Sequence, residues 1–127
     1  MLLNLSNHPV SEWTSEQLSV AEQDFGRVID EPFPMIPPEY SGEEVLLMAE
    51  RYLGICQNIL GLPAQGNAVM LSGEIVFCSL LSHMLLDAGY RVICATTTRE
   101  VINHGDGIIE RKFKFIRFRD YLKLERR

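Results

Sequence analysis

The chain has 127 residues, of which 46% are hydrophobic and 23% are charged. This length and balance are typical of one globular domain, so we expect residues 1–127 to form a single domain without disordered segments. The net charge of −5 argues against a general binder of duplex DNA or RNA, which would carry an excess of basic side chains. No apolar run reaches the roughly 18 residues of a membrane span, and the N-terminus lacks the basic region of a secretion signal. We therefore expect a cytoplasmic protein that has no membrane partner.

The charge is divided unevenly along the chain. Residues 1–98 hold three basic and twelve acidic side chains, a net charge of −9, whereas residues 99–127 hold nine basic and five acidic side chains, a net charge of +4. A basic tail on an acidic body permits one localised anion site. The alternative is that the tail is only the solvated face of a terminal strand.

Neither the cysteines nor the histidines indicate a metal site. The three cysteines lie in apolar runs without CxxC spacing, so we expect reduced core residues, namely Cys56, Cys78 and Cys94. The three histidines are scattered and lack metal-ligand spacing. Neither GxGxxG nor GxxxxGK[ST] is present, and no cofactor is expected.

The first two thirds of the chain alternate between strand and helix patterns. Short apolar runs bounded by turn residues predict strands, and apolar residues spaced by three and four predict helices. Thr14–Gln17 has the form of a capping box, Gly26 is placed to end the helix that follows, and Ser41 or Gly42 is placed to cap the next helix. The predicted elements are strands at 1–5, 28–30, 68–71 and 90–95 and helices at 15–25, 43–56 and 75–88.

The last third changes to a period of two. Glu100–His104 and Ile108–Phe118 flank Gly105-Asp106-Gly107, which is a strong hairpin signal. The alternation slips at Phe115-Ile116, so we expect a β-bulge there.

This order predicts an α/β fold: a Rossmann-like, three-layer sandwich with parallel strand order 2-1-3-4 and a C-terminal antiparallel hairpin at the edge. Ligands of such sheets bind at the carboxyl ends of the strands, where the strand order reverses. That rule selects three loops, which are Ser6–His8, Ser72–Glu74 and Thr96–Arg99.

Two of these loops suggest specific chemistry. Ser72 and Gly73 precede a helix, whose free N–H groups favour a phosphate. Taken alone, this pattern favours the alternative that Ser72 only caps the helix. His8 and Glu74 form the one acid–base pair that the topology brings together, with His8 as the proton-transfer residue. The alternative is that His8 is an ordinary loop residue.

Several segments resemble a known family. The opening LLNLSNHP, Ile36–Glu39, Val92–Val101 and Phe115–Tyr121 are similar to stand-alone, CARF-like ring nucleases of type III CRISPR systems. The resemblance runs nearly end to end, but Ser72–Phe77 matches only the Gly-acid core of the family's third-strand pattern. It implies a CARF-like homodimer that binds cyclic oligoadenylate and cleaves it without a metal, through attack of a ribose 2′-OH on the adjacent phosphate.

The resemblance and the topology together give a set of candidate site residues. The expected catalytic residues are His8, Glu74 and Arg99, of which Arg99 neutralises the phosphate in the transition state. The expected ligand-binding residues are Ser6, Asn7, Ser72, Gly73, Thr96, Thr97, Thr98, Arg117 and Arg119, where the role of the last two depends on which face of the final strand meets the ligand.

Two other functions stay open at this point. One is a sensor or sponge that holds the cyclic oligoadenylate without cleaving it. The other is a small Rossmann-like protein for another nucleotide or for protein interaction, in which the basic tail is structural.

Overall fold

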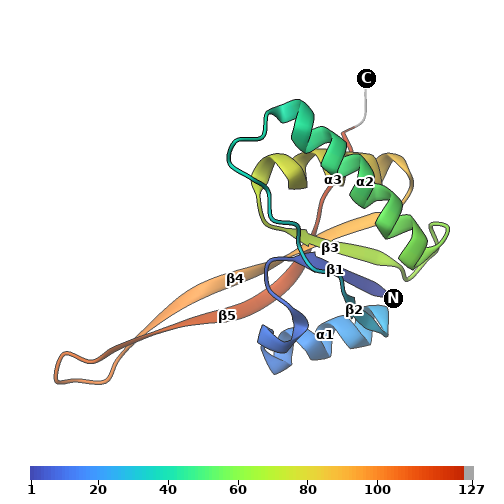
Figure 1. Ribbon diagram of the computed structural model, residues 1–127. Helices are drawn as coiled ribbons and strands as arrows, with labels where there is room; N and C mark the ends of the chain where they lie inside the picture. The colour runs from blue at the N-terminus through green and yellow to red at the C-terminus, as the bar shows by residue number, and fades with distance from the viewer. Residues whose placement is uncertain (125–127) are drawn as a thin grey trace.

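The computed structural model describes residues 1–124, which form an α/β fold around one five-stranded sheet (Figure 1). The elements are β1 (Leu2–Ser6), the short 3-10 helix η1 (Val10–Glu12), α1 (Ser15–Phe25), β2 (Val28–Asp30), α2 (Gly42–Leu60), β3 (Ala68–Ser72), α3 (Ile75–Asp87), β4 (Arg91–Asn103) and β5 (Ile109–Asp120).

The strand order is β2-β1-β3-β4-β5. The first four strands run parallel, and β5 pairs with β4 antiparallel. This confirms the predicted order 2-1-3-4 with an antiparallel pair at the edge, whereas the antiparallel fifth strand departs from a regular Rossmann sheet. Helix α1 covers one face of the sheet, and α2 and α3 cover the other (Figure 1).

The central strand β1 is buried along its whole length because helices cover both faces of the sheet. Leu3 and Leu5 pack into the cluster under α2 and α3, and Leu2 packs into the cluster under α1. Each cluster therefore takes alternate residues of the same strand, as the two-residue period of a strand requires.

The helix ends follow local sequence signals, with one correction. Ser41 caps α2 in a full capping box with Glu44, and Gly26, at a φ of 79°, ends α1. At the start of α1 the Gln17 backbone N–H donates to Thr14 Oγ1 at 3.1 Å, but the Gln17 side chain does not complete the expected box. It is buried, with its Nε2 atom 4.0 Å from Met70 Sδ.

The fourth strand is longer than the sequence predicted. We expected it to end at Ala95 and to be followed by the loop Thr96–Arg99, yet β4 continues to Asn103 because β5 supplies a hydrogen-bonding partner along its whole length. Its β-branched threonines suit that pairing. The register shifts between Thr96 and Thr97, so that Ile116 has no partner, which confirms the predicted bulge.

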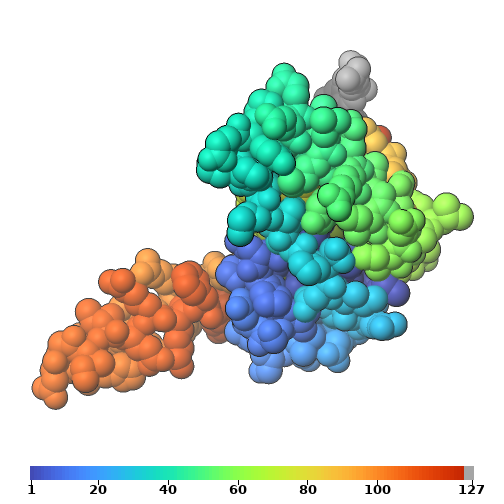
Figure 2. Space-filling model, viewed as in Figure 1, coloured from blue at the N-terminus to red at the C-terminus, as the bar shows by residue number. Residues whose placement is uncertain are grey.

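Beyond this bulge the two strands leave the rest of the molecule as a protruding ribbon (Figures 1 and 2). We call residues Thr98–Lys114 the arm, and residues 1–97 with 115–124 the body. The turn at the tip of the arm is the predicted one: Gly105, Asp106 and Gly107 all have positive φ. The His104 N–H donates to the carbonyl of Ile108, which closes the turn.

All three cysteines are free thiols. Cys56 and Cys78 are buried, as expected, and burial raises the pKa of each to about 12. Cys94 is only half-buried, which corrects its assignment to the core, although burial still raises its pKa. Among residues 1–124 there is no helix with the length and apolar character needed to cross a bilayer.

Candidate functional site

A cavity of about 520 Å³ lies on the α1 side of the sheet. Its walls include His8 from the loop after β1, Ser72 from the end of β3 and Thr97 from β4. The strand-end rule selected three segments in the sequence, and one residue of each lines this cavity. We call this space the α1-side cavity.

The rest of its lining is mainly apolar and aromatic. Trp13 lies between η1 and α1, Gln17 lies on α1, and Phe113 and Phe115 lie on β5. Phe115 is 3% exposed, whereas Phe113, two residues away on the same face, is 68% exposed. The cavity is therefore closed on the side of the body and open on the side of the arm.

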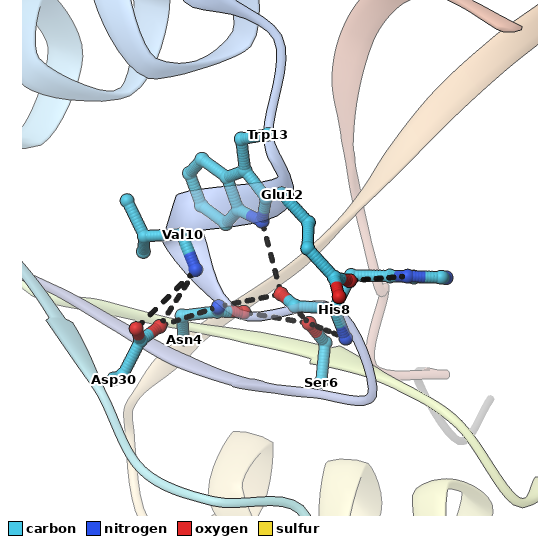
Figure 3. A network of polar contacts seen from close by, with 7 residues as sticks. All are labelled: Asn4, Ser6, His8, Val10, Glu12, Trp13 and Asp30. Carbon is cyan, nitrogen blue, oxygen red and sulfur yellow. Dashed lines mark hydrogen bonds and ion pairs between the residues drawn. The ribbon is translucent and has the colours of Figure 1, made fainter.

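A buried polar network fixes the loop that carries His8 (Figure 3). Asn4 is 1% exposed, and its Nδ2 atom donates to the His8 carbonyl at 2.9 Å and to Asp30 Oδ1 at 2.8 Å. The Ser6 hydroxyl donates to Asn4 Oδ1 at 2.7 Å, and Trp13 Nε1 donates to the same His8 carbonyl at 3.1 Å. Because the network holds the backbone of His8, the imidazole projects from a rigid support.

The His8 imidazole pairs with Glu12, not with Glu74. His8 Nδ1 lies 3.5 Å from Glu12 Oε2, and both side chains are more than half exposed (Figure 3). Glu12 stands four residues after His8, on η1, and both residues line the α1-side cavity. The expected pairing of His8 with Glu74 is therefore wrong. The carboxylate that pairs with His8 is that of Glu12, which is also much closer to it in the sequence.

Glu74 instead closes the start of α3. Its carboxylate accepts from the N–H groups of Val76, at 3.0 Å, and Phe77, at 2.7 Å. These are the N–H groups that we expected to bind a phosphate, so the predicted helix N-terminal anion site is filled by a residue of the chain itself. Ser72 is not the cap; its side chain is half-buried and lines the α1-side cavity.

Gly73 is required by packing against an aromatic ring. A Cβ atom at this position would lie 2.3 Å from Cζ of Phe33, so only glycine allows the ring to pack here. The Phe33 ring also meets the ring of Phe77 edge-on at 5.3 Å between centroids. We expected Gly73 to let a ligand approach the backbone closely. On the side where another residue would carry its Cβ atom, the Phe33 ring occupies that space instead.

Ser6 and Asn7 border a different cavity. This second space, of about 570 Å³, is lined by the loop after β1 and by the proline-rich loop after β2, including Asp30, Glu31 and Phe33. The Ser6 hydroxyl is committed to the network around Asn4, and Asn7 is exposed. The structure therefore does not bring Ser6 and Asn7 into the α1-side cavity with His8.

The pairing of β4 with β5 decides where the predicted cations lie. Arg99 pairs with Phe113 and follows Thr97 by two residues, so it lies on the face of the α1-side cavity. Arg117 and Arg119 pair with Thr96 and Cys94, which places them on the opposite face. Thr96 and Thr98 share that opposite face, because side chains alternate along a strand.

No lysine or arginine lines the α1-side cavity within the part of the chain that the structure describes. Among the described residues that line it, His8 is the one with a basic side chain. Residues 1–124 also bring no group of three His, Cys, Asp or Glu side chains together in an arrangement suited to a metal ion.

Comparison with protein families gives one match. The model of the uncharacterized protein MJ1673 family matches residues 1–119. The chain belongs to this family. The matched range covers β1 through nearly all of β5, so it includes the α1-side cavity and the whole arm of this MJ1673-family chain. Neither the curated proteins nor the solved structures gave a match.

The residues that sequence reasoning missed in this family member include Trp13 and Phe113 in the cavity wall and three polar residues. Asn4 interrupts the apolar run of β1, and a polar residue in a fully buried strand signals a buried hydrogen-bond network. Glu12 stands at i+4 from His8, the usual spacing of a helical pair. Gln17 had no such signal, because its position in a capping-box pattern explained it fully.

Proposed function

We propose that this protein is a CARF-like, homodimeric ring nuclease, which binds cyclic oligoadenylate in the α1-side cavity and cleaves it without a metal. The observation that supports this most directly is that the loop after β1, the end of β3 and the middle of β4 meet at one cavity, with His8, Ser72 and Thr97 in its wall. The resemblance of the opening segment, of β4 and of β5 to such enzymes supplies the substrate class.

The size and lining of the cavity fit part of such a ligand. Its volume of about 520 Å³ suits a small ligand or one half of a larger ring. Trp13 and Phe113 offer aromatic faces, on which adenine bases stack, and Thr97 and Ser72 offer hydroxyl groups for ribose or phosphate. A ring with two-fold symmetry then takes the same residues from each subunit of a C2 dimer.

The proposed reaction is an internal transesterification. The ribose 2′-oxygen attacks its own adjacent phosphorus and forms a new O–P bond, while the bond from phosphorus to the 5′-oxygen breaks. The 2′-OH loses a proton and the leaving 5′-oxygen gains one, so the products are linear chains that end in a 2′,3′-cyclic phosphate. Alignment of the 2′-oxygen with the leaving group supplies several kcal/mol of the rate gain.

His8 is the proposed proton-transfer residue of this reaction. Its imidazole lies in the cavity wall, the network around Asn4 fixes its backbone, and Glu12 lies 3.5 Å from its Nδ1 atom. A carboxylate beside one ring nitrogen orients the ring, so that the other nitrogen faces the substrate. Arg99 is the proposed cation for the phosphate, from the face that the cavity shares with the arm.

The first test is the reaction itself. Purified protein is incubated with cyclic tetra-adenylate and cyclic hexa-adenylate in EDTA, and the products are separated. Linear products with 2′,3′-cyclic phosphate ends are the expected result. Intact ring that stays bound to the protein contradicts cleavage and supports a sensor, and no binding contradicts the proposal as a whole.

The second test is His8→Ala, with His83→Ala as its matched control. We expect His8→Ala to lower the cleavage rate by about 10² to 10⁴ and to leave ring binding nearly unchanged, because proton transfer acts in the transition state. His83 also pairs with a carboxylate at i+4 and 3.5 Å, but on α3, and does not line this cavity. Full activity of His8→Ala would leave alignment of the 2′-OH as the whole mechanism.

One observation favours the second candidate function, a non-catalytic sensor or sponge. Within the described residues, no lysine or arginine lines the cavity, so a single chain offers little charge to stabilise a phosphorane. Cleavage by the wild-type protein separates the two functions, and in a nuclease we expect Arg99→Ala to weaken binding and cleavage together. In a sensor it weakens binding of a ring that the wild-type protein never cleaves.

A further inference from the structure

One face of the arm combines exposed apolar side chains with two arginines. The pairing of β4 with β5 places Arg99, Val101, Ile109, Arg111 and Phe113 on the same face as the α1-side cavity. We call these five residues the arm strip. The exposed fractions of Val101, Ile109 and Phe113 are 62%, 56% and 68%.

On the other face of the arm, Glu110 pairs with two basic side chains. Glu110 Oε2 lies 2.7 Å from His104 Nε2, and Glu110 Oε1 lies 3.4 Å from Lys112 Nζ. Neither Arg99 nor Arg111 makes an ion pair with any residue in the range 1–124. The charges left unpaired near the exposed apolar residues are therefore those of the arm strip.

Such a strip requires a covering partner. A two-stranded ribbon that packs against nothing is only marginally stable in water. Aromatic residues, apolar residues and arginines side by side are the composition of the centre of a protein–protein interface. The arm protrudes from the body without a helix or a third strand over it (Figure 1), so the partner must come from outside this chain.

Charge complementarity points to a second copy as that partner. The arm strip carries two arginines and no acidic side chain, and the first 98 residues of every copy carry a net charge of −9. The α1-side cavity of every copy has no lysine or arginine among its described lining residues. A second copy thus offers a body of net negative charge and a cation-poor cavity to the two arginines of the arm strip.

The arm is long enough to cross the face of a second body. At about 3.4 Å per residue, the segment Thr98–Asn103 spans about 20 Å. A small domain is about 30 Å across, so an arm of this length reaches well past the rim of its neighbour. In a C2 dimer the contact is reciprocal, and each arm lies on the opposite subunit.

We propose that the arm strip of one subunit docks on the body of a second subunit, and that Arg111 contacts a phosphate of the ligand in that second subunit's α1-side cavity. The ligand part of this inference rests on the proposed function, whereas the assembly part does not. Arg99 does not line the cavity of its own chain but lies on the same sheet face, two residues beyond Thr97. In the proposed dimer each site therefore has one arginine nearby in cis and one in trans.

The assembly is tested by sedimentation equilibrium of the full chain. We expect a dimer for the wild-type protein, a dimer at least about tenfold weaker for Arg111→Glu, and a wild-type dimer for the matched control Lys114→Glu. Lys114 pairs with Thr98 on the opposite face of the arm and undergoes the same change of charge. Circular dichroism checks that each variant is folded. A monomeric wild-type protein, or equal weakening by both variants, overturns the proposal.

The contribution in trans is tested by mixing two variants. Neither Arg111→Glu nor His8→Ala alone should cleave cyclic oligoadenylate well. In a one-to-one mixture, at a protein concentration where both variants are dimeric, random exchange gives about a quarter of the sites an intact His8 from one subunit and an intact Arg111 from the other. We expect about a quarter of the wild-type cleavage rate in the mixture.

The two proposals fail in different ways. If the wild-type protein cleaves but the mixture shows no recovery, Arg111 does not act across the dimer and this inference is overturned, while the proposed function stands. If the wild-type protein neither binds nor cleaves the ring, the proposed function fails. Sedimentation then decides the arm contact alone: a dimer that Arg111→Glu dissociates supports it, and a wild-type monomer overturns it.

Discussion

Apolar side chains on one face of β5 are buried in the body and exposed in the arm. Phe115, in the body, is 3% exposed, and its ring lies 5.0 Å from that of Phe118, between centroids. Phe113, in the arm, is on the same face two residues earlier and is 68% exposed. The same alternating pattern in β5 is thus buried where the strand crosses the body and exposed where it runs along the arm.

The same contrast holds for polar groups. In the body, every buried side-chain nitrogen and oxygen atom of the described residues has a hydrogen-bond partner, as the network around Asn4 illustrates. In the arm, Arg99 and Arg111 point from the same face as the exposed apolar residues. The comparison teaches that periodicity identifies the face of a strand that needs a partner, but not the molecule that provides it.

Among substitutions that compare the body with the arm, we expect the largest loss of stability at Asn4, in the body. Asn4→Ala removes the donor to Asp30 and to the His8 carbonyl and leaves the Ser6 hydroxyl with the His8 carbonyl as its acceptor. We expect a loss of about 2–4 kcal/mol in the free energy of unfolding, because three hydrogen bonds of a fully buried side chain are lost. Urea denaturation followed by circular dichroism measures it. The exposed Asn58→Ala is the control, and an equally small loss for both variants would contradict the role of the network.

A smaller effect is expected where Phe33 packs on Gly73. Gly73→Ala places a Cβ atom within 2.3 Å of the ring, so the ring must move and the free energy of unfolding should fall by about 1–3 kcal/mol. In the double variant with Phe33→Leu, the smaller side chain removes most of the clash. The two changes should therefore be non-additive in urea denaturation. Additive losses would mean that the strain at Gly73 has another source.

The buried acids of the body predict a fall in stability at alkaline pH. Burial raises the pKa of Cys56, of Cys78 and of Tyr121 to about 12. Above the unfolded thiol pKa of about 8.5–9 the unfolded chain releases these protons while the folded chain keeps them, so stability decreases as pH rises. The urea midpoint should be lower at pH 9.5 than at pH 8. A constant or rising midpoint would contradict this. The arm, which contains no cysteine or tyrosine, contributes nothing to the effect.

The smallest effect is expected in the arm. Val101→Ala should change the free energy of unfolding by less than about 0.5 kcal/mol at protein concentrations where the chain is monomeric, because the side chain is 62% exposed. Val92→Ala, on the same strand but fully buried, should cost about 2–3 kcal/mol. A clear loss for Val101→Ala that appears only at high concentration would sharpen the comparison, since it would mark the arm as an interface.

Much of the fold and part of the site were accessible from the sequence. The alternation of strands and helices predicted the order 2-1-3-4 and the convergence of His8, Ser72 and Thr97, because parallel strands with helical crossovers have few allowed arrangements. The bulge beside Ile116 and the helix end at Gly26 were also predictable, because each depends on only a few neighbouring residues.

The roles of individual side chains were decided by the tertiary structure. Glu74, His8 and Gln17 each had more than one partner within reach of the chain, and sequence patterns do not rank such competitors. The carboxylate of Glu74 accepts from the N–H groups at the start of α3, and His8 pairs with Glu12. The Gln17 side chain is buried between α1 and the sheet and does not reach the helix cap.

The same holds for β4. By itself the sequence determined that Thr96–Arg99 follows a buried strand and that a basic, alternating segment comes after it. Only the long pairing with β5 decided that these threonines belong to a strand, and that Arg99 and Arg117 lie on opposite faces. The physical reason is that the register of a hairpin is fixed by every hydrogen bond along it, including the shift at the bulge, and a shift of one residue exchanges the two faces.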